Sequence, residues 1–310
     1  MFTSIEICAG AGGQAIGIEK AGFKHLVLIE IDSDACKTLK LNKPKWNVIQ
    51  GDVKDFNASP YKGIDLFAGG VPCPPFSKAG KQLGIDDDRD LFPTALRLVE
   101  ECNPKAIMLE NVKGLLDPKF ADYRNTISEK IKSLGYESEW KLLYASDYGV
   151  SQLRPRVIFV AMKPTDFNNF TWPTPSNKPP KSVGDLLYNE MLQNGWQGAS
   201  EWKEKANSIA PTLVGGSKKH GGPDLGPTRA RAAWLRLGVN GGSIAEFAPD
   251  ENYTGIPRLT VRMAALVQGF PPNWQFYGGK TTAYRQVGNA FPSPVAEAVA
   301  KQIRKALENE

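Results

Sequence analysis

The sequence predicts an α/β fold in which a doubly wound, mostly parallel sheet is joined to a second, smaller domain. Two observations favour this class: short apolar runs alternate with amphipathic stretches over residues 1–163, and a glycine-rich turn follows the first apolar run. Such alternation is typical of a parallel sheet with helices on both faces. A chain of 310 residues is long enough for one large domain and one smaller domain.

The elements of the first part follow from their length and apolar content. Short apolar runs predict buried strands, and the longer amphipathic stretches between them predict helices. We expect strands at residues 4–9, 26–30, 48–50, 64–68, 106–110 and 157–162. We expect helices at residues 14–21, 33–42, 91–102 and 123–134, and a final helix at 294–307.

The composition changes near residue 163 and excludes several classes of protein. From there to about residue 279, Pro, Gly, Trp and charged residues are mixed without long periodic segments, which predicts the second domain at 164–279. Neither a signal peptide nor a membrane span is expected, because no long apolar run is present. The four cysteines form no CxxC pair, so neither a metal site nor a disulfide framework is expected. The net charge of +5 permits a polyanionic partner without indicating one.

The first turn suggests a site for a nucleoside-bearing cofactor. Gly10 and Gly12 allow a tight turn, and Ala15 fits the third position of the G-x-G-x-x-G/A fingerprint. Glu30 ends the second strand, 20 residues after Gly10, where an acid can bind ribose hydroxyls. Asp52 ends the third strand and suits an adenine amino group, although it could equally cap a helix. This pattern does not separate a nicotinamide cofactor from S-adenosylmethionine.

A thiol and a carboxylic acid are expected at the ends of two other strands. Cys73 follows the apolar run 64–68 and lies between Pro72 and Pro74, and Glu110 follows the next apolar run. The carboxyl ends of such strands face one crevice. A nucleophile and an acid there suit attack on an electron-poor ring such as cytosine. A lone cysteine is more often a buried apolar residue, and that interpretation fits the other three: Cys8, Cys36 and Cys102.

The motifs, taken in order, resemble those of the C5-cytosine DNA methyltransferases over nearly the whole chain. Each matching segment is weak evidence alone, but their common order is specific. The segments are 10–13, 30, 52, 72–73, 88–92, 110–112, 152–156, 258–262, 268–271 and 286–290.

The resemblance implies a mechanism of methyl transfer to a cytosine swung out of the duplex. Cys73 attacks C6 of the ring, which makes C5 nucleophilic toward the methyl group of S-adenosyl-L-methionine. Glu110 binds N3 and the exocyclic amine. Arg154 and Arg156 are expected to alternate on a short strand and to face one side. The resemblance implies that these arginines contact the cytosine or a nearby phosphate.

The resemblance also implies which residues bind the cofactor and the DNA. Because residues 289–290 would return to the cofactor pocket, residues 280–310 would join 1–163 in one catalytic domain, and 164–279 would be the target-recognition domain. The implied cofactor residues are Cys8, Ala9, Gly10, Ala11, Gly12, Gly13, Glu30, Ile31, Asp52, Val53, Pro72, Leu91, Asn289 and Ala290. The expected DNA contacts are Ser77, Lys78, Arg89, Lys218, Lys219, Arg229 and Arg231.

Four positions, in three motifs, depart from the pattern of the family. The family usually has Phe where Cys8 stands, and Gln where Pro74 follows the nucleophile. Met263 and Leu266 replace an expected Glu and Arg, which bears on a salt bridge that would orient the recognition domain. None of these changes removes a catalytic group, so we expect an active enzyme.

The preferred interpretation is a DNA cytosine-5 methyltransferase that acts as the modification partner in a prokaryotic restriction system. We expect a cytoplasmic, nucleoid-associated monomer that binds double-stranded DNA and no metal. It would be paired functionally with a restriction endonuclease without a stable complex, and we expect a palindromic target made only of G and C. A transfer-RNA cytosine methyltransferase, a nicotinamide-dependent oxidoreductase and a catalytically silent DNA-binding relative stay open as alternatives. The second would leave Cys73, Glu110 and Arg154 without roles.

Overall fold

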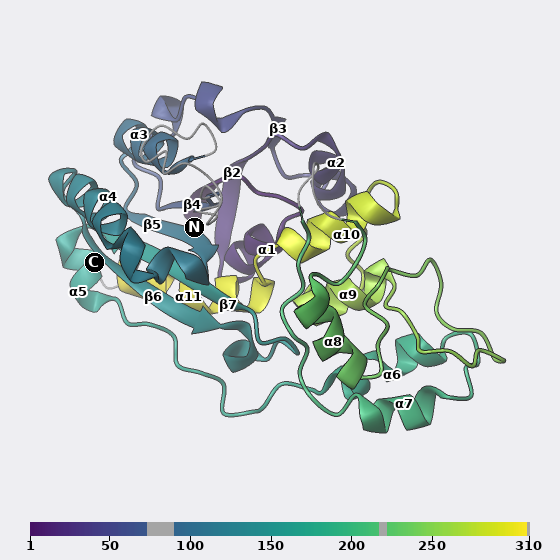
Figure 1. Ribbon diagram of the computed structural model, residues 1–310. Helices are drawn as coiled ribbons and strands as arrows, with labels where there is room; N and C mark the ends of the chain where they lie inside the picture. Colours follow the sequence, from purple (N-terminus) through teal and green to yellow (C-terminus); the bar gives the residue numbers. More distant parts are fainter. Residues whose placement is uncertain (73–89, 217–221, 309–310) are drawn as a thin grey trace.

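A computed structural model of the chain describes residues 1–72, 90–216 and 222–308 (Figure 1). Within these ranges, one seven-stranded sheet has the strand order β3-β2-β1-β4-β5-β7-β6. The strands β1 to β5 pair in parallel, whereas β7 runs antiparallel to β5 and to β6. The predicted α/β class with a mostly parallel sheet is therefore confirmed. The strands are β1 (Phe2–Ile7), β2 (Phe23–Glu30), β3 (Val48–Gln50), β4 (Leu66–Gly70), β5 (Ala106–Val112), β6 (Glu137–Tyr144) and β7 (Pro155–Met162).

Helices cover both faces of the sheet because its strands alternate apolar side chains between the two faces. Ile5 and Ile7 of β1 lie in one core with α3 and α4, whereas Leu66 and Ala68 of β4 lie in another core with α1 and α11. The helices of this part are α1 (Gly13–Lys20), α2 (Ser33–Asn42), α3 (Phe92–Cys102), α4 (Ala121–Ser133) and α11 (Ser293–Leu307).

The sequence prediction missed β6. This strand lies at the edge of the sheet, and most of its residues are partly or fully exposed. Edge strands carry charged side chains toward solvent, here Glu137, Glu139 and Lys141, so no apolar run marks them.

A second group of helices follows the sheet. Its core joins apolar side chains from α6 to α10, among them Trp202, Trp234 and Tyr284. These helices have seven to ten residues each, and the sequence analysis predicted none of them. They are α6 (Val183–Leu192), α7 (Ala199–Lys205), α8 (Thr228–Arg236), α9 (Val261–Gln268) and α10 (Lys280–Asn289).

Two helices lie directly after the predicted domain boundaries. The short helix α5 (Pro164–Asn169) lies on the side of the sheet, and its Phe167 packs against the core that contains α11 (Figure 1). After the second boundary, α10 contributes Tyr284 and Val287 to the core of the second group of helices. The division at residues 164 and 279 stays a prediction.

Two kinds of feature are absent from the described part of the chain. None of its helices has both the length and the apolar character that a bilayer crossing requires. Its His, Cys, Asp and Glu side chains form no group of three or more that could hold a metal ion.

Candidate active site

A cavity of about 250 Å³ lies at the carboxyl ends of the central strands. Strand β1 lies between β2 and β4, so the chain winds away from it in both directions, and ligands of open α/β sheets bind at such a switch point. The walls come from the turn after β1, from the ends of β2, β4 and β5, and from the junction of α10 and α11.

Eight of the expected cofactor residues line this cavity: Cys8, Ala9, Gly10, Ala11, Gly13, Glu30, Asn289 and Ala290. Six others do not line it: Gly12, Ile31, Asp52, Val53, Pro72 and Leu91. The lining also includes eight residues that the sequence analysis did not name: Glu6, Gln14, Asp32, Ala35, Gly70, Arg285, Gln286 and Phe291. For Glu6 a signal was present, because a carboxyl group stands within the otherwise apolar expected strand 4–9.

The glycine turn is held to the end of β2 by one carboxylate. The backbone N–H of Gly10 donates to Glu30 Oε2 at 2.7 Å, and that of Asp32 donates to Glu30 Oε1 at 2.7 Å. The turn uses positive φ angles of 53° at Gly10 and 91° at Gly12. A side chain at Gly13 would lie 2.2 Å from the carbonyl oxygen of Phe291, so only glycine permits this approach of α1 to the C-terminal segment.

The cavity lining is rich in acidic side chains. Four carboxyl groups line it, against the single guanidinium of Arg285 among the described residues. Glu6 is 1% exposed, and neither of its carboxyl oxygens has a hydrogen-bond partner among the residues that the structure describes. Burial, together with the nearby charge of Glu30, raises the pKa of Glu6 well above its ordinary value. Burial also raises the pKa of Glu30, although the N–H donors of Asp32 and Gly10 oppose that shift. A cationic ligand suits such a lining.

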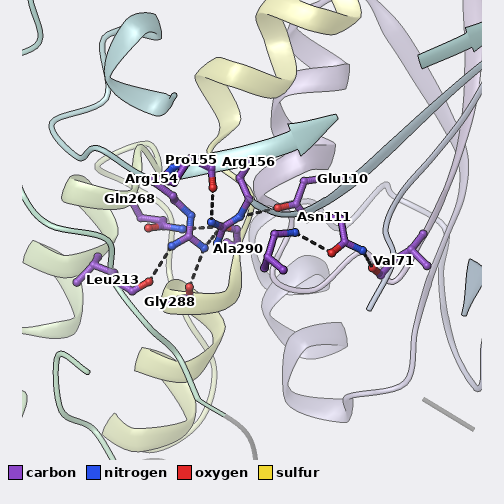
Figure 2. A network of polar contacts seen from close by, with 11 residues as sticks. Val71, Glu110, Asn111, Arg154, Pro155, Arg156, Leu213, Gln268, Gly288 and Ala290 are labelled. Carbon is purple, nitrogen blue, oxygen red and sulfur yellow. Dashed lines mark hydrogen bonds and ion pairs between the residues drawn. The ribbon is translucent and has the colours of Figure 1, made fainter. Parts of the chain in front are cut away.

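The expected acid lies at the edge of this cavity, beside the strand that leads to Cys73. Glu110 of β5 pairs in register with Gly70, the last residue of β4, and a side chain at Gly70 would lie 3.4 Å from Glu110 Oε2. The next residue, Asn111, donates from Nδ2 to the carbonyl oxygen of Val71 at 2.8 Å and so fixes the chain two residues before Cys73 (Figure 2). Cys73 itself lies outside the described residues. Five of the expected DNA contacts lie outside them as well: Ser77, Lys78, Arg89, Lys218 and Lys219.

Arg156 orients the acid. Its Nε lies 2.6 Å from Glu110 Oε1, and its Nη1 donates to the carbonyl oxygen of Pro155 at 2.8 Å (Figure 2). Burial raises the pKa of Glu110, while the charges of Arg156 and Arg154 lower it, and the net shift is upward. The upward shift favours the protonated carboxyl group, which can donate a hydrogen bond to a ring nitrogen.

Arg154 differs from the sequence prediction. We expected it to alternate with Arg156 on one strand, but β7 begins at Pro155, and Arg154 precedes it with a φ of 22°. Its side chain is fully buried and points away from Glu110 toward three backbone carbonyl groups (Figure 2). Nη1 donates to Leu213, and Nη2 donates to Gly288 and Ala290, each at 2.8 Å. The expectation that both arginines face one side was therefore wrong.

Arg154 belongs to a buried polar cluster that also includes Gln152 and Gln268, which we call the Leu213 clamp. Gln152 Oε1 accepts the N–H of Leu213 at 2.8 Å, so Gln152 and Arg154 together bind both backbone groups of Leu213. Gln152 Nε2 also donates to Gln268 Oε1 at 2.8 Å, and Gln268 donates to the carbonyl oxygen of Ala290. The clamp joins the start of β7, the segment around Leu213, the end of α9 and the wall of the cavity.

The remaining expected residues lie in the second group of helices. Arg229 and Arg231 lie on α8 and are exposed. Met263 and Leu266, the two departures on α9, pack against the core of the second group, so this position holds an apolar contact where the family usually has an ion pair.

Comparison with known proteins gives one family. The model of the C-5 cytosine-specific DNA methylases matches residues 2–305. The type II methyltransferase M.NgoMIV of Neisseria gonorrhoeae is 60% identical over 312 aligned residues, covering 100% of this chain and 99% of that protein. The type II methyltransferase M.NaeI of Lentzea aerocolonigenes is 53% identical, covering 99% of this chain and 75% of that protein. A crystal structure of a variant of Spodoptera frugiperda DNMT2 has the same fold, with a TM-score of 0.68 at 18% identity, covering 98% and 100% of the two chains.

Proposed function

The chain belongs to the C-5 cytosine-specific DNA methylase family, and on this premise we propose that it methylates C5 of a flipped-out cytosine in a specific double-stranded DNA site through a covalent bond between Cys73 and C6. The observation that carries the proposal is the register of β4 and β5, which pairs Gly70 with Glu110. Cys73 follows three residues after Gly70, so the nucleophile comes shortly after a residue that lies beside the acid and lines the cavity. Neither the oxidoreductase nor the transfer-RNA alternative is favoured by the family match.

S-adenosyl-L-methionine is the methyl donor that suits the cavity. Its sulfonium and ammonium groups are cationic, and the described lining carries four carboxyl groups. A Cβ atom added at Gly10 would have no described atom within 4 Å apart from those of its chain neighbours, so the turn is open at this residue, which lines the cavity. The first amide groups of α1 have no acceptor within the helix and are available to a polar ligand. When bound, the donor would supply an electrophilic methyl group.

The residues of this chain would perform the other steps. The Cys73 thiolate forms a bond to C6 of cytosine, and the electron pair of the C5–C6 double bond becomes available at C5. Glu110 donates a hydrogen bond or a proton at N3 and so stabilises the charge that the attack places on the ring. Arg156 keeps the Glu110 carboxyl group in position. After methylation a base, for which water suffices, takes the proton from C5, and the electron pair of that C–H bond reforms the C5–C6 double bond. The Cys73–C6 bond breaks and Cys73 leaves as the thiolate, while N3 gives up any proton that it took from Glu110.

We further propose that the enzyme modifies DNA as the partner of a restriction endonuclease, without a stable complex between the two. The two relatives above are type II methyltransferases that align with this chain over its length, which supports this role. Exposed Arg229 and Arg231 would contact the DNA, together with the lysines at 218 and 219 and residues 77, 78 and 89. Arginine reads guanine edges in the major groove, so a target of G and C is consistent with this set.

Trapping the covalent bond tests the proposal. A duplex that contains 5-fluorocytosine at the target should form a complex with the enzyme and S-adenosyl-L-methionine that survives denaturing electrophoresis, because fluorine cannot leave C5 as a proton does. Cys73→Ser should form no such complex, since an alcohol is a much weaker nucleophile than a thiolate. Cys102→Ala, at a buried position on α3, is the matched control and should still be trapped. A trapped complex with Cys73→Ser, or none with the wild type, would refute the mechanism.

A further inference from the structure

The segment that follows α9 returns to the sheet and lies against the glycine turn. Trp274 packs against two apolar clusters, the core of the second group of helices and the small core between β2, α1 and α2. This residue belongs to none of the motifs that identify the site, and it does not line the cavity. It contacts Ala11, which lines the cavity, and Gly12, which does not.

The indole of Trp274 contacts Ala11 and Gly12, the two residues that one peptide of the turn joins. Its Nε1–H donates to the carbonyl oxygen of Ala11 at 3.1 Å, and Ala11 is only 2% exposed. A Cβ atom added at Gly12 would lie 3.0 Å from the edge of the indole ring. Without the indole, a buried carbonyl group would lose its protein partner, which is costly.

The peptide between Ala11 and Gly12 is held at both of its polar groups. Its N–H, that of Gly12, donates to the carbonyl oxygen of Ala9 at 3.1 Å, and its carbonyl oxygen accepts the N–H of Trp274. The start of the turn is bound separately, by Glu30 at the Gly10 N–H. Trp274 therefore supplies one of the two hydrogen bonds that orient the Ala11–Gly12 peptide. This peptide immediately precedes α1, whose first residue, Gly13, lines the cavity.

The indole of Trp274 is itself held by two aromatic rings and by the contacts of the next residue in the chain. Phe270 stacks on it with ring centroids 6.3 Å apart, and Trp46 packs at 6.2 Å. The next residue, Gln275, is bound at both backbone groups by Asn42 of α2, which accepts its N–H at 2.8 Å and donates to its carbonyl oxygen at 2.7 Å. A ring with this support can hold a backbone group in one orientation.

We propose that Trp274 is a positioning residue for the methyl donor, because it fixes the Ala11–Gly12 peptide of the turn that binds the donor. This inference rests on the proposed function, in which the cavity binds S-adenosyl-L-methionine. Trp274 touches neither donor nor cytosine, so its effect should fall on donor affinity and not on the chemical step.

Calorimetric titration of S-adenosyl-L-methionine into Trp274→Phe tests the inference, since phenylalanine keeps a ring but lacks the N–H donor. We expect the donor Kd to rise about 3–10-fold, the range of one neutral hydrogen bond. The KM for the donor should rise by a similar factor, with kcat within about twofold of the wild type.

The chain offers a close control. Trp202 also donates its indole N–H to a buried carbonyl group, that of Gly238 at 3.0 Å, and its ring lies 3.0 Å from the side-chain position of this positive-φ glycine. Trp202→Phe should therefore cost similar stability and leave the donor Kd unchanged. Asn42→Ala, which releases Gln275 without altering the indole, should weaken donor binding in the same direction as Trp274→Phe.

The outcomes separate the inference from its premise. A wild-type enzyme that binds no S-adenosyl-L-methionine would overturn the proposed function and this inference with it. Donor binding by the wild type that is unchanged in both Trp274→Phe and Asn42→Ala would overturn the inference alone. An equal loss of affinity in Trp202→Phe would also overturn it, because the effect would then be a general loss of stability.

Discussion

Replacing Arg154 by lysine separates a structural role of this side chain from a catalytic one. In the structure, Nη1 serves Leu213 and Nη2 serves Gly288 and Ala290. One ammonium nitrogen cannot occupy both positions, so Arg154→Lys must lose at least one buried carbonyl partner. A hydrogen bond from a charged donor contributes about 1.5–3 kcal/mol. With about 2–4 °C per kcal/mol for a large domain, the melting temperature should fall by about 3–12 °C.

Thermal unfolding of Arg154→Lys and Arg156→Lys, measured beside single-turnover methylation, checks this expectation. Arg156 is partly exposed and binds Glu110, so Arg156→Lys should slow methylation while its melting temperature stays near that of the wild type. Arg154→Lys should show a lower melting temperature and weaker donor binding, because Ala290 lines the cavity. A wild-type melting temperature with lost methylation in Arg154→Lys would refute the clamp and assign Arg154 to the chemistry.

Two further predictions concern the donor cavity. The raised pKa of Glu6 means that the folded state binds the proton of this carboxyl group more tightly than the unfolded state does. The stability that this protonation contributes to the fold is fully present below about pH 4.5 and is lost as the pH rises through the folded pKa. Glu6→Gln should therefore raise the melting temperature of the donor-free enzyme more at pH 8 than at pH 5, and an equal change at both would contradict the shift. Cys8 lines the cavity where the family usually has Phe, so Cys8→Phe should tighten S-adenosyl-L-methionine binding by about 2–10-fold in calorimetry. Unchanged or weaker binding by the folded variant would mean that the ring does not reach the ligand.

The sequence predicted the central part of the site because its determinants are local. A glycine turn after one strand and acids at the ends of others specify a switch point, and parallel strands bring their carboxyl ends to one edge. Glu110 lies beside the end of β4 for this reason, since β5 is the parallel neighbour of β4. Glu6 went unnamed, although an acid within a buried strand should find a partner or a ligand.

The role of Arg154 could not be predicted in the same way. Its partners are the carbonyl groups of Leu213, Gly288 and Ala290, and every residue has such a group. No side-chain pattern marks the carbonyl that a guanidinium will bind, so the position depends on how distant segments cross. The same reasoning applies to Trp274, whose acceptor is the backbone of Ala11.

The Leu213 clamp joins the second group of helices to the sheet, and the departures on α9 belong to the core of that group. The clamp provides buried hydrogen bonds to backbone groups, and Met263 and Leu266 provide apolar contact where the family usually has an ion pair. Salt screens buried hydrogen bonds and apolar contacts much less than it screens solvent-exposed ion pairs. The junction between the two groups should therefore hold its geometry as salt rises, so that the salt dependence of DNA binding reports the contacts of the basic side chains with phosphate.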